Sequence, residues 1–260
     1  MSKIEMALRS AKLARNRRYA ITPPPQQFRE SDFDNIPIVA PDADILFENR
    51  VLTPATDSLA HAAYKMLRTR VLQRMRSDGL TSLAITSCAA GDGKTITAVN
   101  LAISLSEEMN QRVVLVDLDL RRPNLDQRLG LSPKHGLSDY LRGDVSLADI
   151  LLRPFERLIL VPTTTPVWNS SENLNSPRMK TFTEEIQSMD TSALIVYDLP
   201  PMLASDDFLS FSPQVDAVLL VIAERKTPRS ALKEARGMID AAKLIGVVLN
   251  MSDAKLAAYY

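Results

Sequence analysis

The segment 83–95 constrains the fold of this 260-residue chain more than any other part of it. An apolar run leads into a stretch of small residues that ends in Gly93, Lys94 and Thr95, and an apolar helical pattern follows at once. A strand, a small-residue loop and a helix start are the layout of a phosphate-binding loop, because loop amides and the helix N-terminus create a positive field. The pattern predicts that Lys94 contacts the β- and γ-phosphates of a nucleotide and that the Thr95 hydroxyl binds Mg²⁺.

The loop departs from the usual phosphate-loop pattern at one position. Cys88 stands where G-x-x-x-x-G-K-[ST] has its first glycine. As the only cysteine of the chain, Cys88 excludes an intramolecular disulfide and suits a reducing compartment. We expect the loop and the helix start to bind ATP with Mg²⁺ through Ala90, Gly91, Asp92, Gly93, Lys94, Thr95 and Ile96.

Composition excludes some functions and limits the location. Hydrophobic residues at 45% and charged residues at 24% are ordinary for a globular protein. The formal net charge is zero, so no overall field attracts nucleic acid, and we expect no nucleic-acid partner. No apolar run reaches the roughly 18–20 residues that cross a bilayer, and the first residues lack the apolar core of a signal peptide. We therefore expect a cytoplasmic protein that reaches a membrane only through a partner.

Apolar runs alternate with helical patterns along the chain. Strands are expected at 81–87, 112–118, 157–162, 193–198, 216–223 and 244–250, and helices at 57–76, 94–108, 136–151, 176–189 and 229–241. The strand segments are nearly continuous runs of Val, Ile and Leu, which indicates burial on both faces. This alternation predicts an α/β fold, a doubly wound and mostly parallel sheet that binds ligands at the carboxyl ends of its strands.

The two ends of the chain differ from the domain expected at 57–250. Residues 1–20 carry six Lys and Arg against one Glu, which fits either a solvated terminus or a basic amphipathic helix that binds a partner or an anionic membrane surface. Six of the sixteen prolines lie in residues 21–56 and indicate an extended arm. Residues 251–260 are expected to form a flexible tail.

Two further predicted strands end in acidic residues near the phosphate loop. Asp117 and Asp119 lie two residues apart, on the same side of an extended segment, and Asp198 ends a later strand. Any one of them could be a helix cap, but three beside a phosphate loop favour a Mg²⁺–nucleotide site. Phosphoryl transfer needs Mg²⁺ across the phosphate oxygens, a lysine on the developing charge and a group that positions the nucleophile. Lys94, Thr95 and the three aspartates supply this set.

The combination of motifs resembles a known family. The loop at 87–95 reads S-x-x-x-G-x-G-K-T, the second segment reads D-x-D-x-R-x-P at 117–123, and the third reads D-x-P-P at 198–201. These Walker A, A′ and B motifs resemble the bacterial tyrosine kinases (BY-kinases) of exopolysaccharide and capsule synthesis, over roughly 57–260. The basic start, the proline arm and the final Tyr-Tyr pair resemble stand-alone members, some of them exosortase-associated, which work with a separate membrane chain-length-determinant protein.

The resemblance assigns roles to the candidate residues. It implies an ATP-dependent tyrosine autokinase in which Lys94 and Thr95 bind phosphate and metal. Asp198 and Asp119 would hold the metal shell, and Asp117 would deprotonate or orient the incoming tyrosine. Asn250 is either an adenine contact or a simple turn residue. The expected phosphoacceptors are Tyr259 and Tyr260 of a second copy, and the expected partner is the cytoplasmic tail of the chain-length determinant at the inner membrane.

Two alternatives stay open. One is a nucleotide-sensing scaffold without kinase activity, and the other is a partitioning-type ATPase. The latter class carries a signature lysine early in the loop, where this chain has Ala89. The E-x-x-R-x-x-R helix that drives ring assembly in BY-kinases reads Ala62-x-x-Lys65-x-x-Arg68 here. Lysine does not replace arginine equivalently, so we expect a monomer or weak dimer.

Overall fold

The computed structural model describes residues 33, 35–53, 56 and 58–253. The basic segment 1–20 and the two expected phosphoacceptors, Tyr259 and Tyr260, lie outside the described residues. Of the helices that the structure describes, none is both long and apolar enough to cross a membrane.

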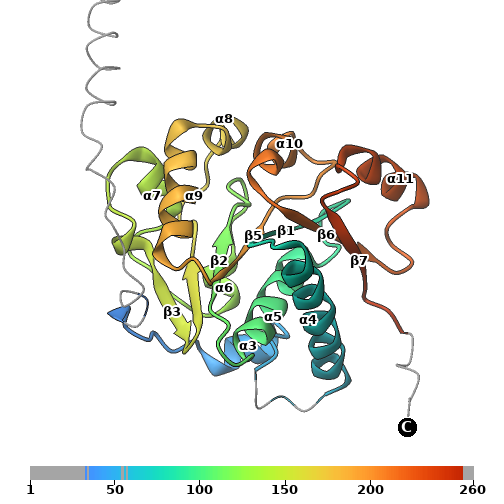
Figure 1. Ribbon diagram of the computed structural model, residues 1–260, viewed down its shortest axis with the longest axis horizontal. Helices are drawn as coiled ribbons and strands as arrows, with labels where there is room; N and C mark the ends of the chain where they lie inside the picture. The colour runs from blue at the N-terminus through green and yellow to red at the C-terminus, as the bar shows by residue number, and fades with distance from the viewer. Residues whose placement is uncertain (1–32, 34, 54–55, 57, 254–260) are drawn as a thin grey trace, which may run out of the picture.

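A seven-stranded sheet forms the centre of the molecule, in the order β3-β4-β2-β5-β1-β6-β7 (Figure 1). All neighbours in the sheet are parallel except β3 and β4. The strands are β1 (Ser82–Ser87), β2 (Val113–Asp117), β3 (Leu152–Phe155), β4 (Leu158–Val161), β5 (Leu194–Asp198), β6 (Ala217–Ala223) and β7 (Leu244–Asn250). The predicted α/β class with a mostly parallel sheet is confirmed.

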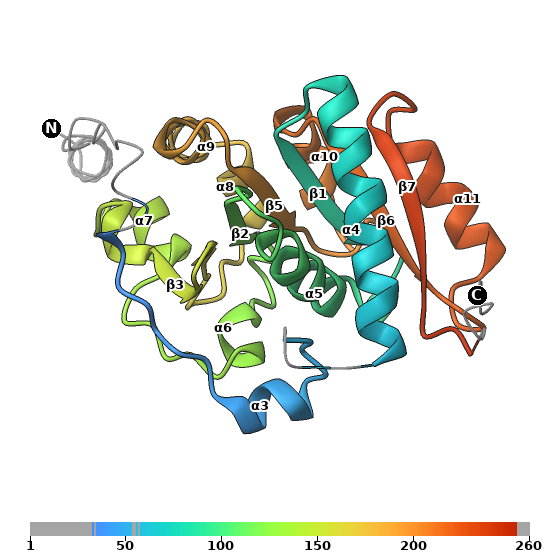
Figure 2. The ribbon, with the colours of Figure 1, turned by 60° about the horizontal axis from the view of Figure 1, so that its bottom comes forward.

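Helices cover both faces of the sheet (Figures 1 and 2). One apolar core lies under α4 (Leu59–Asp78) and α5 (Lys94–Ser106), and it also takes in side chains of α3 (Ala43–Glu48) and α6 (Leu125–Arg128). The core on the other face is covered by α7 (Leu137–Arg142), α8 (Ser170–Leu174), α9 (Pro177–Met189), α10 (Asp207–Phe211) and α11 (Arg229–Met238). Two 3₁₀ turns, Ala148–Ile150 and Ser212–Gln214, complete the described helices.

One predicted helix is wrong in extent. The pattern favoured a helix over 136–151, but α7 ends at Arg142. Gly143 follows with φ +85°, a left-handed conformation that only glycine adopts at little cost, and its amide bonds the Tyr140 carbonyl. The helix therefore stops, and the chain continues into the edge strand β3, which the sequence analysis did not predict.

The described part of the proline-rich segment packs against the domain and contains the short helix α3. Leu46 and Val51 are buried in the core under α4 and α5. Phe33 is fully buried, with the guanidinium groups of Arg112 and Arg153 5.0 and 5.8 Å from its ring centre. An expected extended arm thus carries a helix and three anchoring side chains.

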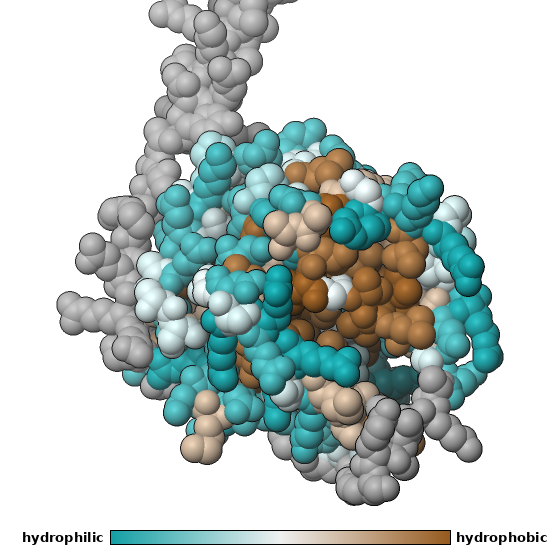
Figure 3. Space-filling view, turned by 45° about the vertical axis from the view of Figure 1, so that its right-hand side comes forward, coloured by the Kyte–Doolittle hydropathy of each residue, from teal (hydrophilic) through white to brown (hydrophobic). Residues whose placement is uncertain are grey.

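The opposite end of the sheet stays open at β7. Val247 and Leu249 of this strand are about half exposed. Figure 3 brings this side of the molecule forward and shows apolar surface there. Since β7 has a neighbour on one side only, its outer edge is uncovered by any other strand in the part of the chain that the structure describes.

Helix α4 carries the degenerate ring motif, and its remaining arginine is engaged within the chain. Arg68 donates to the Ser104 carbonyl at 3.0 Å and lies 3.5 Å from the carboxylates of both Glu107 and Glu108. Ala62 is exposed and uncharged. The groups that would bridge two subunits are therefore absent or already paired.

We expect the isolated protein to be a monomer or a weak dimer at micromolar concentration. The matched variant restores the motif with Ala62→Glu and Lys65→Arg, both at exposed positions of α4, and we expect it to associate more strongly. Multi-angle light scattering on both proteins measures this. A stable octamer of the unmodified chain would contradict the prediction.

Candidate active site

The phosphate loop joins the fully buried strand β1 to α5, and two glycines give it its shape. Gly91 and Gly93 have φ values of +80° and +92°. A Cβ on Gly93 would lie 2.0 Å from Nδ2 of Asn250, and one on Gly91 would lie 2.5 Å from Nζ of Lys226. Both positions therefore favour glycine for conformation, and a side chain at either one would also displace a polar group that contacts the loop. The loop forms without the glycine that Cys88 replaces.

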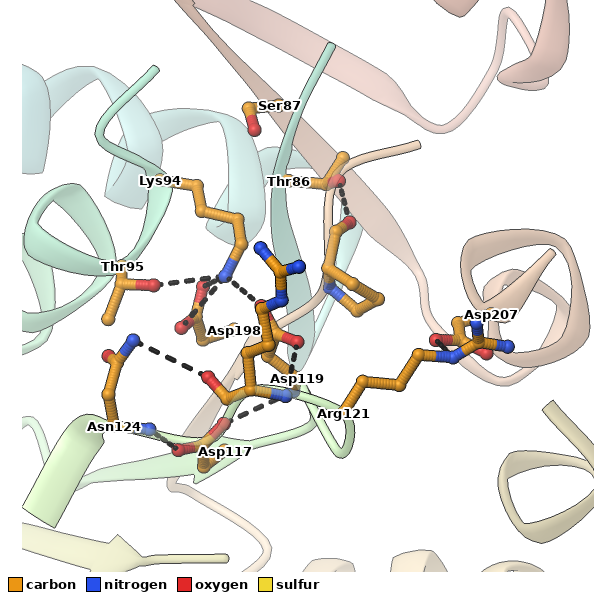
Figure 4. Close-up of polar contacts among 12 residues, drawn as sticks. Thr86, Ser87, Lys94, Thr95, Asp117, Asp119, Arg121, Asn124, Asp198 and Asp207 are labelled. Atoms are coloured by element: carbon orange, nitrogen blue, oxygen red, sulfur yellow. Dashed lines mark hydrogen bonds and ion pairs between the residues drawn. The ribbon is translucent and has the colours of Figure 1, made fainter. Parts of the chain in front are cut away.

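The ammonium group of Lys94 lies at the centre of the site (Figure 4). Its Nζ is 3.0 Å from Oδ2 of Asp119, 3.2 Å from Oδ1 of Asp198 and 2.9 Å from Oγ1 of Thr95. Burial by itself lowers the pKa of Lys94, but Asp198 and Asp119 outweigh it and raise the pKa above its ordinary value. Lys94 is therefore positively charged at neutral pH.

Sheet register brings two of the acids side by side. Asp117 ends β2 and Asp198 ends β5, and the two residues are direct partners in the parallel ladder. Burial raises the pKa of Asp198, while Lys94 and Thr95 act in the opposite direction. Burial and the nearby Asp198 raise the pKa of Asp117 well above its ordinary value. The site therefore concentrates carboxylates that need a cation.

The two acids of the D-x-D motif have different surroundings. Asp117 accepts three backbone N–H groups, from Asp119 on Oδ1 and from Asn124 and Leu125 on Oδ2, each at 3.1 Å. Its side chain thus holds the loop that leads into α6. Asp119 is less enclosed and lines the open cavity beside Lys94. Of this pair, Asp119 lines the cavity and Asp117 does not.

A cavity of about 630 Å³ opens beside these residues. Its wall includes Ala90, Gly91, Gly93, Lys94, Thr95, Ile96 and Asp119 of the predicted site. Asp92 and Asn250 lie behind the loop, where Nδ2 of Asn250 donates to the Asp92 carbonyl at 2.9 Å. Most of the predicted nucleotide and metal residues thus line one cavity, whereas Asp92, Asp198 and Asn250 are not part of its wall.

The residues present fit Mg²⁺ with a nucleotide. The hydroxyl of Thr95 and the carboxylates of Asp119 and Asp198 are hard oxygen donors, and all three contact Lys94 next to the phosphate loop. Within the described ranges, no group of three His, Cys, Asp or Glu residues is arranged to hold a metal ion by itself. Such a site suits Mg²⁺, which is usually bound through one or two carboxylates together with substrate phosphates.

Sequence reasoning missed several residues that shape the site. Lys226, in the turn after β6, donates to the Gly91 carbonyl at 2.7 Å. Arg121 bonds Ser170 at 2.7 Å and pairs with the buried Asp207 at 3.5 Å (Figure 4). Arginines from the arm and from the segment after β2 also line the cavity. Arg121 is the arginine of the D-x-D-x-R-x-P motif, but the motif does not predict its partners, and no motif contains Lys226, because each contact joins segments far apart in the sequence.

Cys88 is expected to be unreactive in the folded protein. Its side chain is fully buried. Burial, with a smaller contribution from the negative charge of Asp92, raises the pKa of the thiol to about 11. Since the thiolate is the nucleophile, reaction with Ellman's reagent at pH 8 should become fast only after unfolding in guanidinium chloride. Rapid labelling of the native protein would contradict this placement.

Comparisons with known proteins agree with this fold. A family model described as "ParA: NUBPL iron-transfer P-loop NTPase" matches residues 80–258. The tyrosine-protein kinase YwqD of Bacillus subtilis is 29% identical over 196 residues, which cover 74% of this chain and 81% of YwqD. The succinoglycan biosynthesis transport protein ExoP of Rhizobium meliloti is 27% identical over 212 residues. That match covers 79% of this chain but 26% of ExoP, so the chain spans about a quarter of that relative.

A solved structure supports the same conclusion about the fold. The kinase domain of the Escherichia coli tyrosine kinase ETK matches with a TM-score of 0.70 at 23% identity. The match covers 91% of this chain and 96% of that domain. Because the family model spans more than half of the chain, the chain belongs to the ParA-type P-loop NTPases, and its sequence is similar to bacterial tyrosine kinases such as YwqD.

Proposed function

We propose that this protein is an ATP-dependent protein tyrosine kinase that phosphorylates Tyr259 and Tyr260 of a second copy. The observation that carries the proposal is the Lys94 cluster: one buried ammonium group contacts Thr95, Asp119 and Asp198 next to the phosphate loop. Phosphoryl transfer depends on positioning and charge stabilisation, and this cluster is built for both. The kinase relatives at 27–30% identity support the acceptor type.

The roles of the residues follow from their places. Loop amides around Gly91 and Gly93 bind the phosphates, Lys94 neutralises charge on the transferred group, and Thr95, Asp119 and Asp198 are the residues that would hold Mg²⁺. The metal, when bound, supplies further positive charge at the phosphate oxygens. During transfer the phenolic oxygen bonds to the γ-phosphorus, the bond to the β,γ-bridging oxygen breaks, and ADP leaves with that electron pair. The phenolic proton passes to a carboxylate of the site.

We further propose that Asp119, rather than Asp117, orients the acceptor hydroxyl and takes this proton. Asp119 lines the cavity, whereas both oxygens of Asp117 accept backbone amides. We expect Asp119→Asn to lose phosphotransfer by at least about 100-fold while the melting temperature changes little. Asp117→Asn should lower the melting temperature as well, because an amide nitrogen cannot accept these N–H bonds. Activity assays and thermal unfolding of both variants separate the two roles. If both variants were equally stable and Asp117→Asn lost more phosphotransfer activity than Asp119→Asn, Asp117 would be the residue that takes the proton.

In the cell, we propose regulation of exopolysaccharide polymerisation or export. The partner would be the cytoplasmic tail of a membrane chain-length-determinant protein, which would hold this cytoplasmic chain at the inner membrane. The name of ExoP, a succinoglycan biosynthesis transport protein, supports the polysaccharide context. Membership of the exosortase-associated type is part of the same proposal and rests on the sequence resemblance alone.

A second candidate is a nucleotide sensor without kinase activity. It is favoured by the degenerate ring helix, whose Arg68 is paired within its own chain. A partitioning-type ATPase is less well supported, because Ala89 offers no charge at the signature lysine position.

Intact mass after incubation with Mg²⁺ and ATP tests the function. The kinase gains one or more phosphates on tyrosine, with or without a synthetic peptide of the partner's tail. Nucleotide binding without any gain in mass, in both conditions, would support the sensor. Turnover to free phosphate without protein phosphorylation would support the ATPase.

A further inference from the structure

One part of the cavity wall is rich in arginine and comes from outside the phosphate loop. The arm before α4 contributes Glu48 and Arg50, and the segment after β2 contributes Arg121, Arg122 and Arg128. Arg121 is engaged by Ser170 and Asp207, as described above. The other three arginines make no ion pair with any residue that the structure describes. The acidic residues in the cavity lining are Glu48 and Asp119, and Asp119 is already paired with Lys94.

The backbone of Arg50 has an uncommon conformation. Its φ is +58°, a left-handed value that is uncommon outside glycine. The buried Asn100 of α5 stabilises it: its Nδ2 donates to the Arg50 carbonyl at 3.2 Å, and its Oδ1 accepts the Leu52 amide at 2.8 Å. The same helix begins at Lys94, so the arm and the phosphate loop share one rigid support.

Arg128 is positioned from the other side. Its Nη1 donates to Oδ1 of Asn49 at 2.8 Å, and Nδ2 of Asn49 reaches the Arg128 carbonyl at 3.4 Å. The arm is also seated closely on the loop after α6, because a Cβ on Gly130 would lie 2.5 Å from the side chain of Asp42. Two segments about 80 residues apart thus bring arginines to the lining of one cavity, in which Glu48 is the acid that is not paired with Lys94.

We propose that Arg50, Arg122 and Arg128, the arginine subsite, bind the phosphate of a phosphotyrosine in the acceptor segment of a second copy. Guanidinium forks match phosphate oxygens, and clusters of arginine are the usual receptors for phosphorylated peptides. The nucleotide phosphates have their own receptor in the loop amides and Lys94. The inference rests on the proposed kinase function: a tail with adjacent tyrosines would be retained by its first phosphate while the second hydroxyl is presented to Asp119.

The test measures binding without catalysis. Fluorescein-labelled peptides of residues 251–260, unmodified or phosphorylated on Tyr259 or Tyr260, are titrated with the full chain in saturating ADP and Mg²⁺, and anisotropy is recorded. We expect a phosphopeptide to bind at least about tenfold more tightly than the unmodified peptide. Arg50→Ala and Arg128→Ala should each remove most of this difference and leave ADP affinity unchanged. Arg74→Ala, an exposed arginine on α4 outside the cavity, is the matched control.

Three outcomes would overturn the subsite. Phosphorylation that weakens binding would mean that repulsion from Asp119 and Asp198 dominates. Phosphopeptide affinity that is unchanged in Arg50→Ala and Arg128→Ala would place the phosphate elsewhere. Loss of ADP affinity in those variants would assign the arginines to the nucleotide. The intact-mass experiment is independent of these results. Specific binding of the phosphopeptide without autophosphorylation would contradict the kinase proposal and still support the subsite.

Discussion

Replacing Lys94 with Met is expected to lower nucleotide turnover by at least about 100-fold while the chain still folds. The ammonium group contacts both Asp119 and Asp198, and in the proposed reaction it neutralises negative charge on the transferred phosphate. Methionine has a similar length but no charge, so it removes this stabilisation and keeps most of the packing. Steady-state phosphate transfer and circular dichroism measure the two halves of the prediction.

The same substitution should change how stability depends on pH. Asp198 is buried, and its pKa is already raised by burial even with Lys94 beside it. Without Lys94 the raised pKa must rise further, because the chief effect that lowers it is lost. Between the unfolded and the folded pKa, the folded state holds a proton that the unfolded state has released. Stability of Lys94→Met should therefore fall as pH rises through this window, more steeply than in the unmodified protein.

A control separates these effects from general loss of charge. Lys65→Met removes an exposed lysine from α4, outside the cavity, and should change neither turnover nor the pH profile. Full turnover in Lys94→Met would mean that the phosphate loop has been assigned wrongly. A melting temperature with the same pH dependence in both variants would mean that Lys94 does not neutralise Asp198 in solution.

The sequence predicted the parts of the fold that depend on local burial. Strands buried on both faces read as continuous apolar runs, so β1, β2 and β4 to β7 appear within a residue or two of their expected ranges. Strand β3 was not predicted because Leu152–Phe155 contains Arg153 and Pro154, a composition that only an edge strand tolerates. The helix expected over 136–151 ends before Gly143, because the left-handed backbone of this glycine stops the helix although apolar residues continue the helical pattern beyond it.

The residues of the candidate site likewise include some that could be predicted from the sequence and some that could not. Asp117 and Asp198 were predictable from sequence, since acids at the ends of adjacent parallel strands must meet. The contact between Lys226 and Gly91 spans 135 positions and depends on where the turn after β6 lies in space. The left-handed conformation of Arg50 also has no local signal, because it is stabilised by Asn100 from another helix. Tertiary packing alone places these two cations.

The tyrosines of the chain differ sharply in accessibility, and this leads to the second large effect. There are six in the sequence. Tyr140 and Tyr197 are fully buried, and burial raises the pKa of both hydroxyls. Burial also raises the pKa of Tyr64, whose side chain bonds Thr97 and Asn100. Tyr140 and Tyr197 cannot present a reactive hydroxyl to a second molecule without local unfolding, and the hydroxyl of the partly buried Tyr64 is engaged within the chain. The remaining candidates are Tyr19, Tyr259 and Tyr260, all outside the described residues.

Deleting Tyr259 and Tyr260 is therefore expected to remove most phosphotyrosine while nucleotide binding is retained. These residues follow β7 in the sequence, and the last residue of β7, Asn250, touches the phosphate loop. The double substitution to Phe keeps both rings and removes only the hydroxyls, so it should behave like the deletion. Tyr19→Phe is the matched control and should keep full phosphorylation. Phosphotyrosine that persists in the deletion and disappears in Tyr19→Phe would move the acceptor to the basic N-terminal segment.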